Sequence, residues 1–353
     1  MPSMKGKPKV VTFGELLLRL SPPGHERFMQ SPTLQASFGG AEANVAVSLA
    51  QFGLDSHFVT RLPKNAIGDA AVRALRAEAV NVDSIRRRGE RIGIYFAESG
   101  ASQRPSFVVY DRAHSALSEL ELSSIPLDVA WEDELRGASW FHTSGITPAL
   151  SKDLADFTKI ALATARRSGA RVSFDINYRS KLWSEEAEAR SVLQPLLQYV
   201  NVLIANEEHL LTMLGMPIER SREPTSHVSE DVLLDAAGRV VAEYGIEQVA
   251  ITLRESLSAS ENGWSALLYD AKTKTLHRGP RYVVTLVDRI GGGDAFAAGL
   301  IFSILDGRSP EDALGFAIAA GALKLTIVGD FNHVPVEEVE RVASGEATGH
   351  VRR

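Results

Sequence analysis

One glycine-rich stretch decides how this chain is interpreted: Val287-Asp288-Arg289-Ile290-Gly291-Gly292-Gly293-Asp294-Ala295-Phe296-Ala297-Ala298-Gly299. Three consecutive glycines allow positive φ and bring backbone N–H groups close to a ligand without side-chain interference. The alanine-rich run after them is helical in character, and a helix start adds unpaired N–H donors and the positive end of the helix dipole. The stretch therefore predicts a site for a phosphate group or a developing negative charge.

Asp294 is the chemically distinctive residue of this stretch. A carboxylate in the first turn of a helix is stabilised by the dipole, so we expect it to be ionised at neutral pH and able to accept a proton or hold a metal. The simpler alternative is that Asp294 only caps the helix above a tight turn. Asp288, six residues earlier, and the small residues of the following helix favour a ligand site. Neither the P-loop pattern nor the dinucleotide pattern G-x-G-x-x-G fits these glycines.

Residues 288–294 resemble the second signature of the PfkB, or ribokinase-like, carbohydrate kinases, which usually reads D-[TS]-x-G-A-G-D. Arg289 stands in place of the usual Thr or Ser, and Gly292 in place of the usual Ala. The resemblance implies that Asp294 is the catalytic base and that Gly291, Gly292 and Gly293 form an anion hole for the transferred phosphoryl group. The D-R-x-G-G-G-D form is similar to a branch of 2-keto-3-deoxygluconate (2-dehydro-3-deoxygluconate) kinases.

The composition is that of an ordinary globular protein. The chain has 353 residues, 44% of them hydrophobic and 23% charged, which suits one large α/β domain or two small ones. A net charge of −6 gives no general footprint for nucleic acid or an anionic membrane. The absence of cysteine excludes disulfides and thiolate chemistry, and no apolar run is long enough to cross a bilayer. We expect a cytoplasmic protein with no nucleic-acid or membrane partner, and residues 344–353 read as a polar tail.

A second glycine turn, Gly39-Gly40, precedes an Ala/Val/Leu run that ends before Gly53. It is open to a simple interpretation, a helix start with a glycine C-cap. Alternatively, the glycines let a small polyol approach the backbone while Asn44, one turn on, offers a donor and an acceptor. The stretch resembles the first PfkB signature, G-G-x-x-x-N-x-A, which implies sugar binding by Gly39, Gly40 and Asn44.

Residues 92–98 and 106–112 read as an antiparallel hairpin. Within it, Tyr95, Tyr110 and Arg112 present two hydroxyls and a guanidinium suited to an anionic sugar. The alternative is that edge-strand aromatics pack against a partner subunit. The resemblance implies the first interpretation, because 2-keto-3-deoxygluconate kinases carry a similar Tyr followed by Tyr-x-Arg that contacts the keto acid.

A polar strand end, Asp175-Ile176-Asn177-Tyr178-Arg179, places alternating polar residues where open parallel sheets bind ligands. The stretch resembles the D-x-N-x-R-x-x-L-W element of sugar-acid kinases. We expect Arg179 to bind the substrate carboxylate, because a guanidinium fork matches a carboxylate bidentately. A salt bridge from Arg179 to Asp175 is the alternative.

The nucleotide side is identified mainly through the resemblance, which implies that Asn206, Thr252, Arg254, Gly291 and Gly293 bind the nucleotide and that residues 329–332 close that side. The family pattern N-x-x-E has a Glu near magnesium, but this chain has His209 at that position. Glu207 or Glu208 is then the candidate magnesium ligand, or the metal is held mainly through water and nucleotide.

Together, the alternation of short strands and helices predicts an α/β fold with a mostly parallel central sheet flanked by helices. The resemblance covers nearly the whole chain and implies a single ribokinase-like domain over 1–353, with a small β-sheet lid from about 15–37 and 90–113. It implies an ATP- and Mg²⁺-dependent phosphotransferase with an alcohol group as acceptor (EC 2.7.1.45), giving the 6-phosphate of 2-keto-3-deoxygluconate. An exposed lid sheet favours a homodimer or higher homo-oligomer.

Three alternatives stay open at this stage. The first is a fructokinase or another PfkB sugar kinase, including one for a related sugar acid with different stereochemistry. The second is a non-catalytic sugar-binding protein on the same fold, favoured by His209 and opposed by Asp294. The third is a nucleoside kinase, which would need an apolar base pocket in place of Arg112 and Arg179. Dependence on a monovalent cation is not determined by these motifs.

Overall fold

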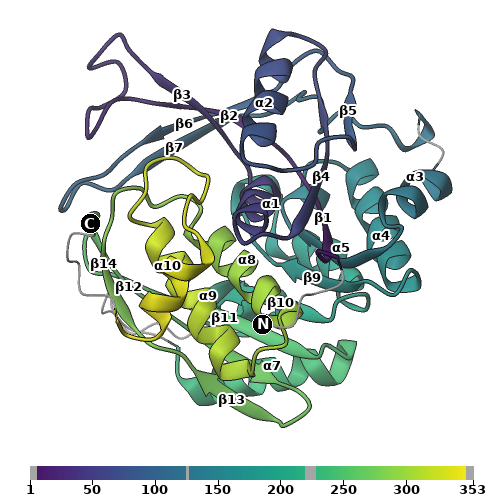
Figure 1. The fold of residues 1–353 in the computed structure, drawn as a ribbon, viewed down its shortest axis with the longest axis vertical. Helices are drawn as coiled ribbons and strands as arrows, with labels where there is room; N and C mark the ends of the chain where they lie inside the picture. Colours follow the sequence, from purple (N-terminus) through teal and green to yellow (C-terminus); the bar gives the residue numbers. More distant parts are fainter. Residues whose placement is uncertain (1–5, 125–126, 219–227, 347–353) are drawn as a thin grey trace.

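The computed structural model describes residues 6–124, 127–218 and 228–346 (Figure 1). Most of the predicted polar tail lies outside these ranges. The strands are β1 (Lys9–Phe13), β2 (Leu17–Ser21), β3 (Gln35–Gly39), β4 (Asp55–Leu62), β5 (Ile85–Arg87), β6 (Gly93–Glu98), β7 (Phe107–Asp111), β8 (Ala138–Ser144), β9 (Arg171–Asp175), β10 (Val202–Asn206), β11 (Gln248–Ser256), β12 (Glu261–Asp270), β13 (Thr275–Arg278) and β14 (Tyr282–Thr285). The α-helices are α1 (Ala41–Gln51), α2 (Ala66–Ala77), α3 (Leu127–Glu134), α4 (Lys152–Arg167), α5 (Glu186–Leu197), α6 (Glu207–Leu214), α7 (Glu230–Tyr244), α8 (Gly292–Leu305), α9 (Pro310–Lys324) and α10 (Val336–Ala343).

The central sheet is mostly parallel. Within the described ranges its strand order is β13-β12-β11-β10-β9-β8-β1-β4-β5, with β14 also paired to β12. Neighbours from β11 to β5 run parallel, whereas β12 pairs antiparallel with β11, β13 and β14. Helices cover both faces of this sheet (Figure 1). The α/β architecture predicted from the alternating pattern is therefore confirmed.

Two hydrophobic cores lie on opposite faces of the central sheet. On β8, Trp140 belongs to the core shared with α1, α8 and α9, and its neighbour Phe141 belongs to the core shared with α4. Successive side chains of a strand point to opposite faces, so a strand buried on both sides reads as a continuous apolar run. This explains why these strands show no polar alternation in the sequence.

A second, smaller sheet has the order β3-β2-β6-β7 and projects to the upper left of Figure 1. The predicted hairpin over 92–98 and 106–112 is present as β6 and β7, which pair antiparallel with Tyr95 opposite Tyr110. Strand β2 ends just before Pro22-Pro23, because proline has no N–H to continue a ladder. The small sheet thus combines segments that are more than 50 residues apart in the chain.

Close packing of α8 against α9 supports the glycine-rich loop from below. A Cβ atom on Gly299 would lie 2.9 Å from the Cα of Ala317, so only glycine permits this approach. The helix α8 begins at Gly292, one residue into the glycine run, and Gly291 is its N-cap. The loop and the first helical turn together face the carboxyl ends of the parallel strands, where ligands bind in open α/β sheets.

Candidate active site

A cavity of about 490 Å³ lies between the carboxyl ends of the central strands and the small sheet. It is lined by all but one of the residues that the sequence analysis assigned to binding or catalysis. These are Gly39, Gly40, Asn44, Tyr95, Tyr110, Arg112, Arg179, Asn206, Glu207, Glu208, Thr252, Arg254, Gly291, Gly293 and Asp294. Gly292 is the exception, because it is buried as the first residue of α8 and packs towards Leu325.

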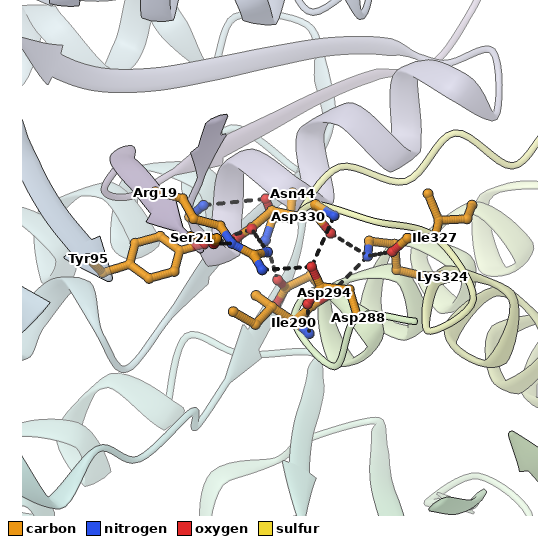
Figure 2. A network of polar contacts seen from close by, with 12 residues as sticks. Arg19, Ser21, Asn44, Tyr95, Asp288, Ile290, Asp294, Lys324, Ile327 and Asp330 are labelled. Atoms are coloured by element: carbon orange, nitrogen blue, oxygen red, sulfur yellow. Dashed lines mark hydrogen bonds and ion pairs between the residues drawn. The ribbon is translucent and has the colours of Figure 1, made fainter. Parts of the chain in front are cut away.

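Asp294 lies in the first turn of α8, where its Oδ2 accepts a 2.7 Å hydrogen bond from Asn44 Nδ2 (Figure 2). Burial raises the pKa of Asp294 to about 6, with Asp330 adding to the rise; Asn44, Arg179 and Lys324 oppose it. The rise differs from our expectation of a carboxylate stabilised by the helix dipole, because loss of water outweighs the favourable groups. A pKa of about 6 still leaves Asp294 mostly ionised above pH 7, as a general base requires.

The glycine-rich loop is held in a conformation that its sequence requires. Gly291 has a φ of 87°, in the left-handed region, and a Cβ there would lie 2.5 Å from the carbonyl oxygen of Asp330. Asp288 secures the loop on both sides, since its carboxylate accepts hydrogen bonds from the N–H of Ile290 at 3.1 Å and of Gly329 at 3.0 Å. Asp288 therefore organises the loop, and its contacts are those of a structural residue, not of a catalytic one.

Two carboxylates below the loop are bridged by a buried arginine from the small sheet. Arg19 on β2 pairs with Asp288 at 2.7 Å and Asp330 at 2.8 Å, and the hydroxyl of Tyr95 on β6 donates to both oxygens of Asp330 at 2.7 and 2.6 Å (Figure 2). These carboxylates raise the pKa of Arg19, although burial opposes them. The network ties the small sheet directly to the loop that precedes Asp294.

The hairpin residues make contacts that the sequence did not reveal. Tyr95 is buried and stacks on Tyr110 with ring centroids 5.8 Å apart, and its hydroxyl is used by Asp330. Arg112 forms an ion pair with Glu15 and lies 5.3 Å from the centre of the Tyr110 ring. Tyr95, Tyr110 and Arg112 were predicted to face a sugar, and all three line the cavity, but the hydroxyl of Tyr95 is already bonded to Asp330.

One wall of the cavity carries three arginines, Arg179, Arg254 and Arg289, beside His209. Burial lowers the pKa of Arg254 to about 10, and the charges of Arg289 and Arg179 contribute. Burial, with Arg179 and Arg254, lowers the pKa of His209 to about 3, so its imidazole is neutral at physiological pH. Grouped cations of this kind are stabilised by an anionic ligand, because the ligand relieves their mutual repulsion.

Arg179 is exposed and follows the end of β9. Its guanidinium donates to the carbonyl of Tyr178 at 3.1 Å, and within the described part of the chain no ion pair joins it to Asp175. The sequence analysis predicted that strand alternation continues from Asp175 to Arg179. This prediction is wrong, since β9 ends at Asp175 and Asn177 has a φ of 39°. Asp175, Asn177 and Arg179 nevertheless all line the cavity, because the turn redirects the chain.

Comparison with known proteins assigns this arrangement to a family. The model of pfkB family carbohydrate kinases matches residues 7–336. The chain belongs to the pfkB family of carbohydrate kinases. Among solved structures, this pfkB kinase is similar to 2-dehydro-3-deoxygluconokinase from Thermotoga maritima, with 48% identity, a TM-score of 0.89, and coverage of 96% of this chain and 99% of the other. The ribokinase-like fold is thereby confirmed.

Two relatives resemble the kinase over almost its whole length. A 2-dehydro-3-deoxygalactonokinase from Haloferax volcanii is 34% identical over 97% of this chain and 98% of its own length. A 2-dehydro-3-deoxygluconokinase from Bacillus subtilis is 29% identical over the same shares. The described residues contain no helix long and apolar enough to cross a membrane.

Two further carboxyls of this pfkB kinase lie near Asp294. Glu42 accepts hydrogen bonds from the N–H and hydroxyl of Ser144 at 3.0 and 2.6 Å and from Thr147 at 3.1 Å, and burial raises its pKa to about 7. Burial also raises the pKa of Asp175 to about 7, with Asp294 adding to the rise. Each negative charge in this group makes the next ionisation less favourable, so an incoming proton is readily accepted here.

Sequence reasoning missed the residues that support the loop, above all Arg19, Lys324 and the actual position of Asp330. Residues 329–332 were assigned to the nucleotide side, but the Asp330 carboxylate contacts Arg19 and Tyr95 of the small sheet. One signal was present for Arg19, a single arginine within the apolar run Leu16-Leu17-Leu18-Arg19-Leu20, since a charge on a buried strand requires a partner. The partners, Asp288 and Asp330, lie more than 260 residues away, and nothing in the local sequence indicates them.

Proposed function

We propose that this carbohydrate kinase transfers the γ-phosphoryl group of ATP to a hydroxyl of 2-keto-3-deoxygluconate, giving the 6-phosphate. The observation that carries the proposal is the guanidinium of Arg179, exposed in the same cavity as Asp294 and close enough to lower its pKa. A sugar acid supplies a carboxylate for that guanidinium, whereas a neutral sugar does not. The similarity to 2-dehydro-3-deoxygluconokinases supports the same substrate class.

Asp294 acts as the general base in the proposed mechanism. Its ionised carboxylate accepts the proton of the attacking hydroxyl, while Asn44 holds one carboxylate oxygen at 2.7 Å and so orients the other. The N–H groups at Gly291, Gly293 and the start of α8 stabilise charge on the transferred phosphoryl group. Phosphoryl transfer depends chiefly on such positioning and electrostatic stabilisation, which a rigid loop provides.

The nucleotide occupies the part of the cavity lined by Asn206, Thr252 and Arg254, with the arginine facing its phosphates. Carboxylates of Glu207 and Glu208 line the same part, and the described residues contain no cluster of three acidic or histidine ligands. This donor set fits Mg²⁺, which commonly keeps several waters and takes one or two carboxylates together with substrate phosphates. When bound, the ion neutralises charge on the nucleotide phosphates.

The small sheet serves as a lid over the sugar within a single domain. Support comes from Arg19 and Tyr95, which connect the sheet to Asp288 and Asp330 beside the glycine-rich loop. A closed lid excludes water and so limits hydrolysis of ATP. Because the reaction uses ATP, we assign the kinase to the cytoplasm.

The lid also supplies the surface for a homodimer or higher homo-oligomer. On β7, Phe107, Val109 and Tyr110 are 57%, 42% and 47% exposed, which is a large apolar exposure for an edge strand. Light scattering coupled to size-exclusion chromatography tests this: the wild type should be oligomeric, and Phe107→Ser with Val109→Ser should shift it to monomer. A wild-type monomer across micromolar concentrations contradicts this assignment.

The first experiment measures ADP release with ATP and Mg²⁺ against 2-keto-3-deoxygluconate, its galacto epimer, gluconate, fructose and ribose. We expect turnover confined to the two keto-deoxy acids, with phosphate on C6 by ³¹P NMR. The galacto epimer belongs in the panel because the Haloferax relative carries that name. Asp294→Asn should retain ATP binding and lose turnover about 10²- to 10⁴-fold. Turnover on fructose or ribose refutes the substrate assignment, and near-normal turnover by Asp294→Asn refutes the base.

A further inference from the structure

A buried lysine lies directly behind the glycine-rich loop. Lys324 is the last residue of α9, and its side chain is fully buried. Its Nζ donates hydrogen bonds to three backbone carbonyls, those of Ile290 at 3.0 Å, Ile327 at 3.2 Å and Gly329 at 2.7 Å (Figure 2). An ammonium group has three donors and no acceptor, so these carbonyls use its full hydrogen-bonding capacity.

Surrounding carboxylates favour the charged form of Lys324. Burial lowers its pKa, and Arg19 acts in the same direction, whereas Asp288, Asp330 and Asp294 raise it. A charge removed from water is costly unless hydrogen bonds and nearby opposite charges offset the loss, and here three carbonyls and three carboxylates contribute. Burying a charged lysine at the end of α9 costs free energy that an apolar side chain would not, so we infer that its charge and hydrogen bonds have a function.

The carbonyls that Lys324 binds belong to the two segments that shape the loop. Ile290 precedes Gly291, and in a planar trans peptide the C=O and the following N–H point in opposite directions. With the Ile290 oxygen turned towards Lys324, the N–H of Gly291 points away from the lysine. Gly291 lines the cavity, so this orientation suits a donor to a phosphoryl oxygen. The other two carbonyls belong to residues 327–329, whose Gly329 also binds Asp288.

We propose that Lys324 is a positioning residue for phosphoryl transfer, whose ammonium takes the place of a bound monovalent cation and holds the Ile290–Gly291 peptide so that its N–H faces the transferred group. Carbonyl oxygens 2.7–3.2 Å from a single positive centre are the ligands that also replace the hydration shell of K⁺. Because this cation is covalently attached, the enzyme does not require K⁺ in solution. The inference rests on the proposed anion hole, and deepens it.

The first test compares wild-type turnover in 100 mM tetramethylammonium chloride and 100 mM KCl, with the sugar from the panel that the enzyme accepts. The expected rates agree within twofold. Stimulation by K⁺ of tenfold or more overturns the inference, even if every variant below fails to fold. Turnover of an unexpected sugar refutes the substrate assignment alone, so the two failures are distinguishable.

The second test uses two substitutions that differ in the space they leave. Lys324→Ala opens room for a small cation beside the three carbonyls, whereas Lys324→Met fills that room with a neutral chain. Both should lose about 100-fold in kcat, the typical effect of a displaced catalytic group, with KM for ATP changed less than threefold. K⁺ or methylammonium at 100 mM should restore Lys324→Ala at least tenfold and leave Lys324→Met unchanged.

Controls separate positioning from loss of structure. Melting temperature and ATP binding establish that each variant is folded, and Lys272→Met removes a charge from an exposed lysine and should behave like the wild type. Folded variants that retain more than half of wild-type kcat contradict the inference. So does a folded Lys324→Ala that no small cation restores, since a purely structural lysine gives that result.

Discussion

Lowering the pH should reduce turnover through Asp294 at a pH where an ordinary aspartate would still be ionised. Burial raises the pKa of this carboxyl to about 6, from its ordinary value of 3.8. A base must be deprotonated to act, so activity is present above this pKa and is lost as the pH falls through it. The acid limb of the profile therefore reports the environment of Asp294.

The size of the effect follows from the pKa. With a pKa of about 6, roughly ten in eleven molecules carry ionised Asp294 at pH 7 and about one in eleven at pH 5, a tenfold fall. An aspartate with an unshifted pKa of 3.8 would lose only about 6% over the same interval. Asn44 donates to the charged form and lowers this pKa, so Asn44→Ala should move the acid limb to higher pH.

The assay is kcat/KM for the sugar acid from pH 4.5 to 8.5, at saturating ATP and Mg²⁺, with ADP measured directly by chromatography. Glu42→Gln and Asp175→Asn are the matched controls, because burial raises the pKa of each carboxyl to about 7. The acid limb should persist in both. A profile that is flat from pH 7 to pH 5, or a limb that disappears in either control, refutes the assignment of the titrating base to Asp294.

Three further predictions concern Arg179 in the cavity wall, Gly291 in the glycine-rich loop, and the ion pairs of Arg19. Arg179→Ala should raise KM for the sugar acid on the order of 10- to 100-fold, from the loss of a charged hydrogen bond, with little change in KM for ATP. Equal increases of both KM values in steady-state kinetics would make Arg179 structural. Gly291→Ala should lower the free energy of unfolding by about 1–3 kcal/mol, because φ is 87° there. A Cβ on Gly293 would meet nothing within 4 Å, so Gly293→Ala should melt like the wild type. Equal melting temperatures for the two variants contradict this prediction. Arg19→Met should lower the free energy of unfolding in urea by about 3–5 kcal/mol, because it leaves two buried carboxylates unpaired. The control Arg136→Met, at an exposed ion pair, should lower it by less than about 1 kcal/mol. An Arg19→Met variant as stable as the wild type would show that the Arg19 ion pairs do not stabilise the fold.

Local sequence predicted the elements well where the chemistry is local. The run from Gly291 to Asp294 indicated an anion site at a helix start, because glycine conformations and unpaired N–H groups depend only on neighbouring residues. The hairpin containing Tyr95 and Tyr110 was predicted for the same reason. Periodicity failed at Arg179, since a left-handed Asn177 after the strand end redirects the chain, and no alternation pattern records that turn.

The sequence by itself determined the α/β fold, the helix start that carries Asp294, and the family to which the chain belongs. The tertiary structure alone decided what holds that site together. Lys324 ends an alanine-rich helix and resembles any lysine that favours a helix C-terminus, yet folding buries it against the Ile290 carbonyl, 34 residues away. Arg19 likewise meets Asp330 across 311 residues. Contacts between distant segments also set the raised pKa of Asp294, because burial is a property of the packed molecule and not of the residue or its neighbours in the chain.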